Sequence, residues 1–312
     1  MNNQPDVRGE DVFCRICPRN CGADRRDSAG VCGETNELVI ARAALHMWEE
    51  PCISGEHGSG TVFFSGCNLR CIYCQNRAIA LALRGRRVTP EELLAHMNHL
   101  VELGANNINL VTPSHYVPQL VDVLKTFRNQ SVQVPIVYNT SSYEKVETLK
   151  KLEGLVDVYL PDYKYSSPET AARYSNAPDY PQVALAAIDE MLRQVGEPVF
   201  AESPECEDGM IRKGVIIRHL VLPGHVEESK EAIRILHGRY GDSVYLSIMN
   251  QYTPPSDEDE KKKLPRNLRD KLSEEDYGEV VDYAIELGVE NGFIQEGDTA
   301  EESFIPPFEE SL

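Results

Sequence analysis

Three cysteines on one short stretch of the chain have types and spacing that could do chemistry. Cys67, Cys71 and Cys74 follow the pattern C-x3-C-x2-C directly after the apolar run Thr61–Phe64, which is typical of a buried strand. Thiolates are soft ligands, and three on one loop can hold three irons of a [4Fe–4S] cluster while the fourth iron keeps an open position. Spacing alone leaves two other interpretations open: a zinc site with its fourth ligand elsewhere, and three unrelated buried thiols.

The residues around these cysteines resemble a known family. The string Cys67-x3-Cys71-x-Tyr73-Cys74 resembles the C-x3-C-x-aromatic-C signature of the radical S-adenosylmethionine (SAM) superfamily. The longer string from Cys71 to Arg77 is similar to the cluster loop of the pyruvate formate-lyase activating enzyme branch, although Gln75 stands where that branch typically has His. The similarity continues through the motifs between residues 61 and 250.

The resemblance implies a cofactor chemistry. The amine and carboxylate of SAM would complete the open iron of the [4Fe–4S] cluster. One electron would then split the carbon–sulfur bond, giving methionine and a 5′-deoxyadenosyl radical that abstracts hydrogen. The task left to the protein is to position the cofactors and keep water out.

Further residues match the family motifs that contact SAM. Asp162-Tyr163-Lys164 resembles the D-x-K motif of the activating enzymes, which implies that Lys164 neutralises the SAM carboxylate while Asp162 offsets the sulfonium or fixes the amine. The alternative is a surface ion pair after a strand. Tyr73 resembles a residue near the adenine, or else fills the core. The same resemblance places other SAM contacts at Asn76, Thr112, Asn139, Leu222 and Asn250. Thr112 stands where the superfamily has a Gly-Gly-Glu stretch, and Asn250 stands where the activating enzymes have a His. Leu222 lies in a turn, directly before a Pro-Gly pair.

A second group of thiols lies near the N-terminus. Cys14, Cys17, Cys21 and Cys32 fall within nineteen residues that contain little apolar sequence. A segment that cannot build its own core usually needs a metal, and four thiolates would close the coordination sphere of a zinc ion or of an auxiliary iron–sulfur cluster. A thiol-rich coil without metal is the alternative. We expect a cysteine-rich extension at 1–57, a core at 58–299 and a tail at 300–312.

The rest of the chain predicts an α/β fold. Short apolar strands alternate with amphipathic helices, such as 90–103, which has Thr89 as N-cap and Pro90 at its first position. This alternation predicts a parallel sheet curled into a partial or full barrel of the (β/α) type. In such sheets the chemistry lies at the carboxyl ends of the strands, where the polar motifs named above fall. We expect residues 38–48 to form a strand or hairpin that packs the extension against the core, and residues 214–222 to form a strand. Residues 256–271 are dense in charge and proline, and we expect a long exposed loop there.

Three single residues outside these motifs carry separate expectations. His115 follows the second strand of the core and is the better candidate among the histidines for a substrate contact. His219 is expected to pack inside a strand. Cys206 lies in an acidic stretch and is expected to be incidental.

Composition restricts the function classes. The 312 residues are 41% hydrophobic and 26% charged, typical of a globular protein, and the net charge of −19 argues against binding to nucleic acid or to an anionic membrane. The sequence contains no apolar run long enough for a membrane span, and residues 1–10 lack a signal-peptide core. Nine cysteines without such a signal indicate the reducing cytoplasm, where thiols bind metal more often than they pair.

The expected activity is that of a radical SAM enzyme resembling the activases of glycyl-radical enzymes. It would abstract hydrogen from a glycine of a partner protein, with an electron supplied by flavodoxin or ferredoxin. A second interpretation keeps these cofactors but assigns a small molecule or a peptide side chain as substrate. A third is a non-catalytic iron–sulfur or zinc scaffold.

Overall fold

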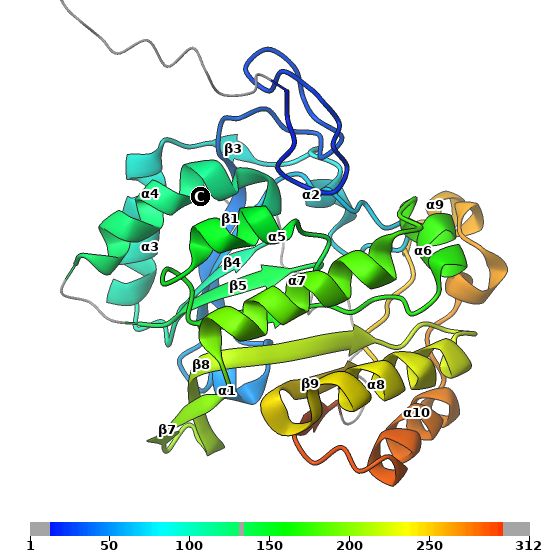
Figure 1. Cartoon of the computed structure of the whole chain (residues 1–312). Coiled ribbons are helices and arrows are strands. Elements are labelled where there is room, and N and C mark those ends of the chain that lie inside the picture. Colours follow the sequence, from blue (N-terminus) through cyan, green and yellow to red (C-terminus); the bar gives the residue numbers. More distant parts are fainter. Residues whose placement is uncertain (1–12, 131–133, 296–312) are drawn as a thin grey trace, which may run out of the picture.

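The computed structural model describes residues 13–130 and 134–295 of the chain (Figure 1). The expected tail at 300–312 and the first twelve residues of the expected extension lie outside these ranges. Figure 1 shows the four-cysteine segment, residues 13–38, as looped chain above α2. Within the described residues, no helix is both long and apolar enough to cross a lipid bilayer.

A ten-stranded, mostly parallel sheet forms the framework. Its strands are β1 (Val39–His46), β2 (Ser59–Phe64), β3 (Arg86–Arg87), β4 (Ile108–Val111), β5 (Ile136–Thr140), β6 (Val158–Pro161), β7 (Val199–Ser203), β8 (Cys206–Leu220), β9 (Tyr245–Met249) and β10 (Gly292–Ile294). The order is β10-β9-β8-β6-β5-β4-β2-β1-β3, with β7 paired to β8. The seven strands from β10 to β2 in this order are parallel. Among the described strands β10 and β2 do not pair, so the sheet is the expected parallel one and its closure into a full barrel is not shown.

Helices connect the parallel strands and lie along the outside of the sheet (Figure 1). The α-helices are α1 (Pro51–Ser54), α2 (Arg77–Ala80), α3 (Pro90–Glu102), α4 (Val117–Arg128), α5 (Val146–Leu149), α6 (Pro168–Ser175), α7 (Tyr180–Val195), α8 (Val226–Tyr240), α9 (Glu258–Lys263) and α10 (Glu274–Glu286), with short 3-10 turns η1 (Ser114–Tyr116), η2 (Lys150–Leu152), η3 (Gly241–Ser243) and η4 (Arg266–Arg269). The expected N-terminus of α3 is confirmed, because Thr89 accepts from the Glu92 N–H while the Glu92 carboxylate accepts from the Thr89 N–H.

Side chains on the inner face of the sheet divide into an apolar bottom and a polar top. Successive inward residues lie two apart along a strand, such as Val137 and Asn139 on β5. At the bottom, α1 inserts Cys52 and Ile53, both fully buried, against an apolar group that includes Val137. Helix α1 therefore plugs the amino end of the strands, and the polar residues collect at the opposite end.

The edge of the sheet next to β2 is antiparallel. Strand β1 pairs with β2 and with the two-residue β3, so the expected strand at 38–48 is present and joins the main sheet. This pairing places Glu49, which follows the end of β1 at His46 after two intervening residues, close to the ends of the central strands. The N-terminal part of the chain thereby contributes to the same framework as the core.

Two expectations on the elements are wrong. The segment 256–271 is not one long loop, because it contains α9 and η4. Strand β8 begins at Cys206 rather than near Gly214, and its first half forms an antiparallel hairpin with β7. Cys206 is half-buried at the start of β8 and packs against the apolar group around α1.

Candidate active site

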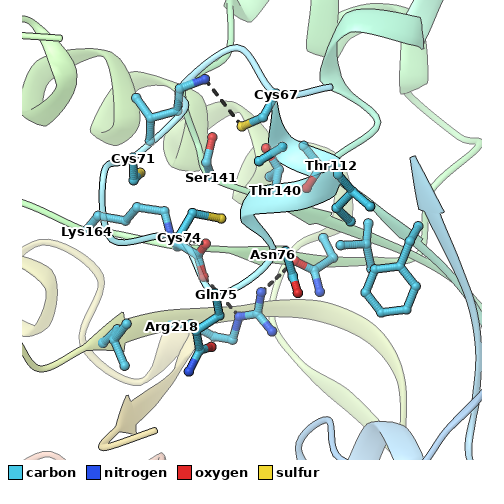
Figure 2. Close-up of a pocket in the computed structure, with 18 of the residues that line it drawn as sticks. Cys67, Cys71, Cys74, Gln75, Asn76, Thr112, Thr140, Ser141, Lys164 and Arg218 are labelled. Carbon is cyan, nitrogen blue, oxygen red and sulfur yellow. Dashed lines mark hydrogen bonds and ion pairs between the residues drawn. The ribbon is translucent and has the colours of Figure 1, made fainter. Parts of the chain in front are cut away.

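The cysteine loop, residues 65–76, leaves the carboxyl end of β2 and crosses the mouth of the sheet (Figure 2). Gly66 opens the turn with a φ of 83°, and a methyl group in its place would lie 2.8 Å from the carbonyl oxygen of Cys32. Arg70 has a φ of 56°, which is uncommon for a residue with a side chain. Strained backbone of this kind collects at functional sites. The loop lines a cavity of about 210 Å³ with the side chains of Cys67, Cys71 and Cys74.

The three thiols suit a [4Fe–4S] cluster with one open iron. They are the only cysteines among the described residues that line the cavity, so the protein offers three sulfurs and no fourth. Within 13–130 and 134–295, no three His, Cys, Asp or Glu side chains are arranged to hold a single metal ion. A cluster does not require that arrangement, because each of its cysteines binds a separate iron.

Burial keeps two of these thiols protonated in the absence of metal. It raises the pKa of Cys67, and it raises the pKa of Cys74 to about 12, with the neighbouring Cys71 adding to both shifts. Iron binds the thiolate form, so loading of this site must release protons.

Hydrogen bonds reach two of the sulfurs. The backbone N–H of Leu69 donates to Cys67 Sγ at 3.4 Å, as the upper dashed line in Figure 2 shows. The hydroxyl of Ser175, the last residue of α6, donates to Cys71 Sγ at 3.0 Å. Both donors would stabilise negative charge on the sulfur.

A network of charged groups forms the polar floor of the cavity (Figure 2). Arg218 of β8 lies at its centre, where Nε donates to Asp162 Oδ1 at 3.1 Å and Nη1 donates to Glu49 Oε2 at 3.0 Å. Its Nη2 donates to Asn139 Oδ1 at 2.5 Å, and Lys164 Nζ donates to the second oxygen of Asp162 at 2.7 Å. Burial works to raise the pKa of Asp162, but the positive charges of Lys164 and Arg218 outweigh burial and lower that pKa. Asp162 is therefore a carboxylate near neutral pH.

Lys164 lies between the polar floor and the cysteine loop (Figure 2). Burial works to lower its pKa, but the negative charges of Asp162 and Cys71 raise it above the usual lysine value. The ammonium therefore stays charged, beside the thiols and facing the cavity. A small anionic group such as a carboxylate would be attracted to this position.

Two residues at the ends of β4 and β5 offer groups to a ligand. Thr112 has a φ of 59°, an outlier for a β-branched residue, and lines the cavity. Ser141 also lines it, and its buried hydroxyl oxygen has no hydrogen-bond partner among the described residues. A buried polar atom without a partner is costly, and a bound ligand would remove that cost.

The structure brings most of the expected SAM contacts to this one cavity. Those that line it are Tyr73, Asn76, Thr112, Asn139, Asp162 and Lys164. Leu222 and Asn250 lie outside this lining, and their neighbours Leu220 and Gln251 occupy the corresponding places. The backbone N–H of Asn250 donates to Gln295 Oε1 at 2.8 Å, and the next residue, Gln251, lines the cavity instead of Asn250.

Sequence reasoning missed Glu49 and Arg218. Both belong to the polar floor, and Arg218 directly follows the buried apolar run Val215–Ile217 of β8 with a side chain that is only 12% exposed. A charged residue inside such a strand is a signal, because an uncompensated charge would be expelled from a core. The sequence could not name the partner, since 169 residues separate the two.

The expectation for His115 is wrong. The ring is buried, its Nε2 lies 2.8 Å from the carbonyl oxygen of Ser65, and it is not among the residues that line the cavity. Burial, together with the nearby Arg25, lowers the pKa of His115 to about 3. The neutral ring therefore supports the start of the cysteine loop. His219 is packed as expected, with Nδ1 at 2.7 Å from the Tyr163 carbonyl.

The four-cysteine segment lies against the cysteine loop and contains neither helix nor strand in its described residues. Cys21 and Cys32 face the same point, since a methyl group at Gly30 would lie 3.3 Å and 3.4 Å from their sulfurs. Burial raises the pKa of Cys17 to about 11, and the charge of Cys14 adds to the shift. All nine cysteines are within the described ranges and none forms a disulfide.

Comparisons with known proteins identify the family. A family model described as "Radical SAM superfamily" matches residues 61–249. The uncharacterized protein MJ0674 of Methanocaldococcus jannaschii is 29% identical over 248 residues, which cover 77% of this chain and 66% of that protein. The chain thus spans just under two thirds of this curated relative.

Two solved structures of Streptococcus suis SuiB are similar at 12% identity. One is bound to the precursor peptide SuiA, with a TM-score of 0.48 over 75% of this chain and 47% of that one. The other is bound to S-adenosylmethionine, with a TM-score of 0.47 over 75% of this chain and 49% of that one.

The family model covers more than half of the chain and begins in the strand that leads into the three cysteines. The protein therefore belongs to the radical SAM superfamily, which makes it an enzyme with a [4Fe–4S] cluster and SAM as its cofactors.

Proposed function

We propose that this enzyme abstracts a hydrogen atom from a C–H bond by radical SAM chemistry, in the manner of the activases of glycyl-radical enzymes. The observation that carries the proposal is that the three free thiols and the Lys164–Asp162 pair open onto the same cavity. When the cluster and SAM are bound, they supply a 5′-deoxyadenosyl radical after one-electron reduction. The substrate class, a glycine of a partner protein, rests on the resemblance of the cysteine loop and the D-x-K motif to those activases.

The chain's own residues would bind and orient SAM. The Lys164 ammonium suits the SAM carboxylate, and the Asp162 carboxylate suits the amine or the sulfonium. Asn139 is held in place by Arg218, so it can present its amide to the ligand without a search among rotamers. Tyr73 is buried and packs edge-on against Tyr165, so its ring can form a fixed apolar wall.

The test is production of 5′-deoxyadenosine. Protein reconstituted anaerobically with iron and sulfide is reduced with dithionite in the presence of SAM, and the product is measured by chromatography. We expect turnover in the natural protein and none above background in a Cys71→Ala variant. Equal product from both proteins would overturn the proposal. Incubation with a candidate glycyl-radical enzyme and detection of its radical by electron paramagnetic resonance (EPR) then tests the substrate class.

One observation favours a second substrate class, a small molecule or a peptide side chain. Gln75, which stands where the activators have a His, lines the cavity together with Gln251, the residue after Asn250, and the Gln75 side-chain amide donates to the backbone carbonyl of Gln251. A glutamine side chain, unlike a histidine, cannot carry charge near neutral pH. In that case SAM cleavage would proceed while no glycyl-radical partner acquired a radical.

We further propose that Cys14, Cys17, Cys21 and Cys32 bind a second metal centre, either zinc or an auxiliary iron–sulfur cluster. Four thiols in a segment without regular secondary structure support this. A single zinc ion would require the four sulfurs to move closer together, because they are not arranged to hold one ion in the described residues. Iron, sulfide and zinc counts on the natural protein and on a Cys67/Cys71/Cys74→Ala variant decide between the metals. Iron left in the variant would indicate a second cluster, and zinc would indicate a structural site. If the variant contained neither metal, the proposal of a second centre would be overturned.

The remaining proposals concern the setting of the reaction. Nine free thiols suit the reducing cytoplasm. The reducing electron is assigned to a flavodoxin or a ferredoxin, and substitution of either protein for dithionite in the 5′-deoxyadenosine measurement tests this.

A further inference from the structure

One sulfur of the cysteine loop receives a side-chain hydrogen bond from a distant part of the chain. Ser175 is buried at the carboxyl end of α6, and its hydroxyl donates to Cys71 Sγ at 3.0 Å. The phenol oxygen of Tyr165, also buried, lies 2.7 Å from the Ser175 oxygen. Because Ser175 has one proton and gives it to the sulfur, Tyr165 is the donor in the second bond. The result is a directed chain from Tyr165 through Ser175 to Cys71.

Arg19 of the four-cysteine segment holds this chain in place. Its Nε donates to the Asn68 carbonyl at 2.7 Å and its Nη2 to the Leu69 carbonyl at 3.1 Å, both in the cysteine loop. On the other side Nη2 donates to the Ser175 carbonyl at 2.7 Å and Nη1 to the Asn176 carbonyl at 2.5 Å. One guanidinium therefore fastens the end of α6 to the cysteine loop.

A second contact fixes the same geometry. The backbone N–H of Ile72 donates to the Tyr174 carbonyl at 2.9 Å. Asn176 has a φ of 48°, which ends α6 and turns the chain away directly after Ser175. The position of the Ser175 hydroxyl is thus set by contacts on both sides rather than by its own rotamer alone.

Such a hydrogen bond has a consequence for electron transfer. Reduction of a cysteine-bound cluster adds negative charge that is shared with the sulfurs, and a donor to a sulfur stabilises the reduced form. Donation from Tyr165 polarises the Ser175 hydroxyl and strengthens the bond. Loss of the donor would make the cluster harder to reduce.

We propose that Ser175, backed by Tyr165 and positioned by Arg19, raises the reduction potential of the cluster held by Cys67, Cys71 and Cys74. This inference rests on the proposed function, because it presupposes a cluster at these cysteines that responds to SAM. It gives the four-cysteine segment a role in setting that potential, through Arg19, that does not depend on which metal the segment binds.

The test is an EPR-monitored redox titration of the reconstituted protein, following the signal that SAM alters so that a second cluster does not interfere. In Ser175→Ala we expect the ratio of reduced to oxidised cluster at a fixed potential to fall about tenfold, which is about 59 mV for a one-electron couple. Tyr165→Phe keeps the ring and removes only the phenol oxygen, so we expect a smaller shift in the same direction. Arg19→Gln should also shift the potential downward.

Two matched variants separate tuning from general destabilisation. Ser167→Ala removes the N-cap hydroxyl of the same helix, which accepts from the Thr170 N–H far from Cys71, and should lower stability without moving the potential. Arg15→Ala removes an exposed cation from the same segment as Arg19 and should leave the potential unchanged.

An unchanged potential in Ser175→Ala with full iron content overturns the inference and leaves the proposed function intact. If Ser175→Ala does not retain the cluster, an unshifted Tyr165→Phe overturns it in the same way. A natural protein whose iron signal does not respond to SAM overturns the inference and the proposed function together.

Discussion

Arg218 is the residue on which the polar floor of the cavity depends. It is the shared donor to Glu49, Asp162 and Asn139, and its own side chain is 12% exposed. Replacement by Met would leave the two carboxylates in a buried site with weaker compensation. We expect Arg218→Met to lower the free energy of unfolding by about 3–5 kcal/mol, measured by urea denaturation.

Arg218→Lys is the informative companion to this variant. It retains a charge but cannot donate to three acceptors in the fork geometry of a guanidinium, so an intermediate loss is expected. A loss below about 1 kcal/mol in Arg218→Met, the value typical of a surface ion pair, would contradict the account of the floor as a buried network.

We expect Lys164 to contribute more to the binding of SAM than to the stability of the fold. In Lys164→Gln the Asp162 carboxylate keeps its bond from Arg218, so stability should change little. The SAM carboxylate would lose a charged donor worth about 1.5–3 kcal/mol, or roughly ten- to a hundredfold in affinity. Titration of SAM against the EPR signal of the cluster measures this. Lys150→Gln, at an exposed position, is the control, and equal SAM affinity in both variants would contradict the assigned role.

At the scale of elements, the β7–β8 hairpin is fastened to the bottom of the sheet by Glu205. Its Oε2 accepts from Asn106 Nδ2 at 2.9 Å, from the Glu56 N–H at 3.0 Å and from His57 Nδ1, also at 3.0 Å. The approach is so close that a side chain at Gly55, where φ is 53°, would collide with that oxygen at 2.5 Å. The hairpin, whose residues 199–213 do not line the cavity of the cysteine loop, is therefore part of the packed framework.

This contact predicts a pH dependence of stability. The donor Asn106, together with His57, lowers the pKa of Glu205 to about 2, so its contribution is complete above the unfolded value of about 4.3 and is lost as the pH falls toward 2. Hydrogen bonding to Glu205 raises the pKa of His57, so the contribution of His57 is present below about 6.5 and is lost as the pH rises through its raised pKa.

We therefore expect Glu205→Gln to cost about 1–2 kcal/mol of unfolding free energy near pH 5.5, and the difference from the natural protein to shrink as the pH falls to about 3. Urea denaturation across this range is the measurement. Glu202→Gln, exposed on the same hairpin, should cost less than about 0.5 kcal/mol. A cost of Glu205→Gln that stays constant with pH would contradict the assignment.

The elements also show what the sequence could and could not reveal. The capping box of α3 was readable because its signals are local, within three residues of one another. Helix α9 was missed because it buries no side chain and so has no apolar stripe, although Asp257 caps it and its charges run from acidic to basic. The first half of β8 was missed because an exposed hairpin is held by backbone pairing rather than by alternating burial.

The same limit applies to the site. The three cysteines lie close to one another in the sequence, and so do Asp162 and Lys164, so the spacing within each group predicted its members. Glu49 and Ser175 act through partners more than a hundred residues away, and no local pattern marks such a pair. Tertiary folding alone brings them together.

At the scale of the whole molecule, the four-cysteine segment and the cysteine loop form one continuous set of contacts. The backbone N–H of Cys67 donates to the Cys32 carbonyl at 3.1 Å, and Arg70 donates to the Val31 carbonyl at 3.0 Å. Figure 1 shows the segment at the end of the molecule opposite to the β7–β8 hairpin. Because the segment has no helix or strand to hold its own shape, its order depends on its sulfurs and on this contact surface.

Loosening the segment should therefore loosen the cysteine loop and little else. In a Cys14→Ser/Cys21→Ser variant we expect faster amide hydrogen exchange at residues 65–71, because their partners on the segment are no longer fixed. Strand β9, which pairs with β8 and β10, and helix α10, which packs on α8, should exchange as in the natural protein. Cys206→Ser, which removes a half-buried thiol at the opposite end of the molecule, is the matched control and should leave residues 65–71 unchanged. Unaltered exchange at 65–71 in the double variant would mean that the loop holds its shape alone, and the segment would then be an appendage rather than a support of the active site.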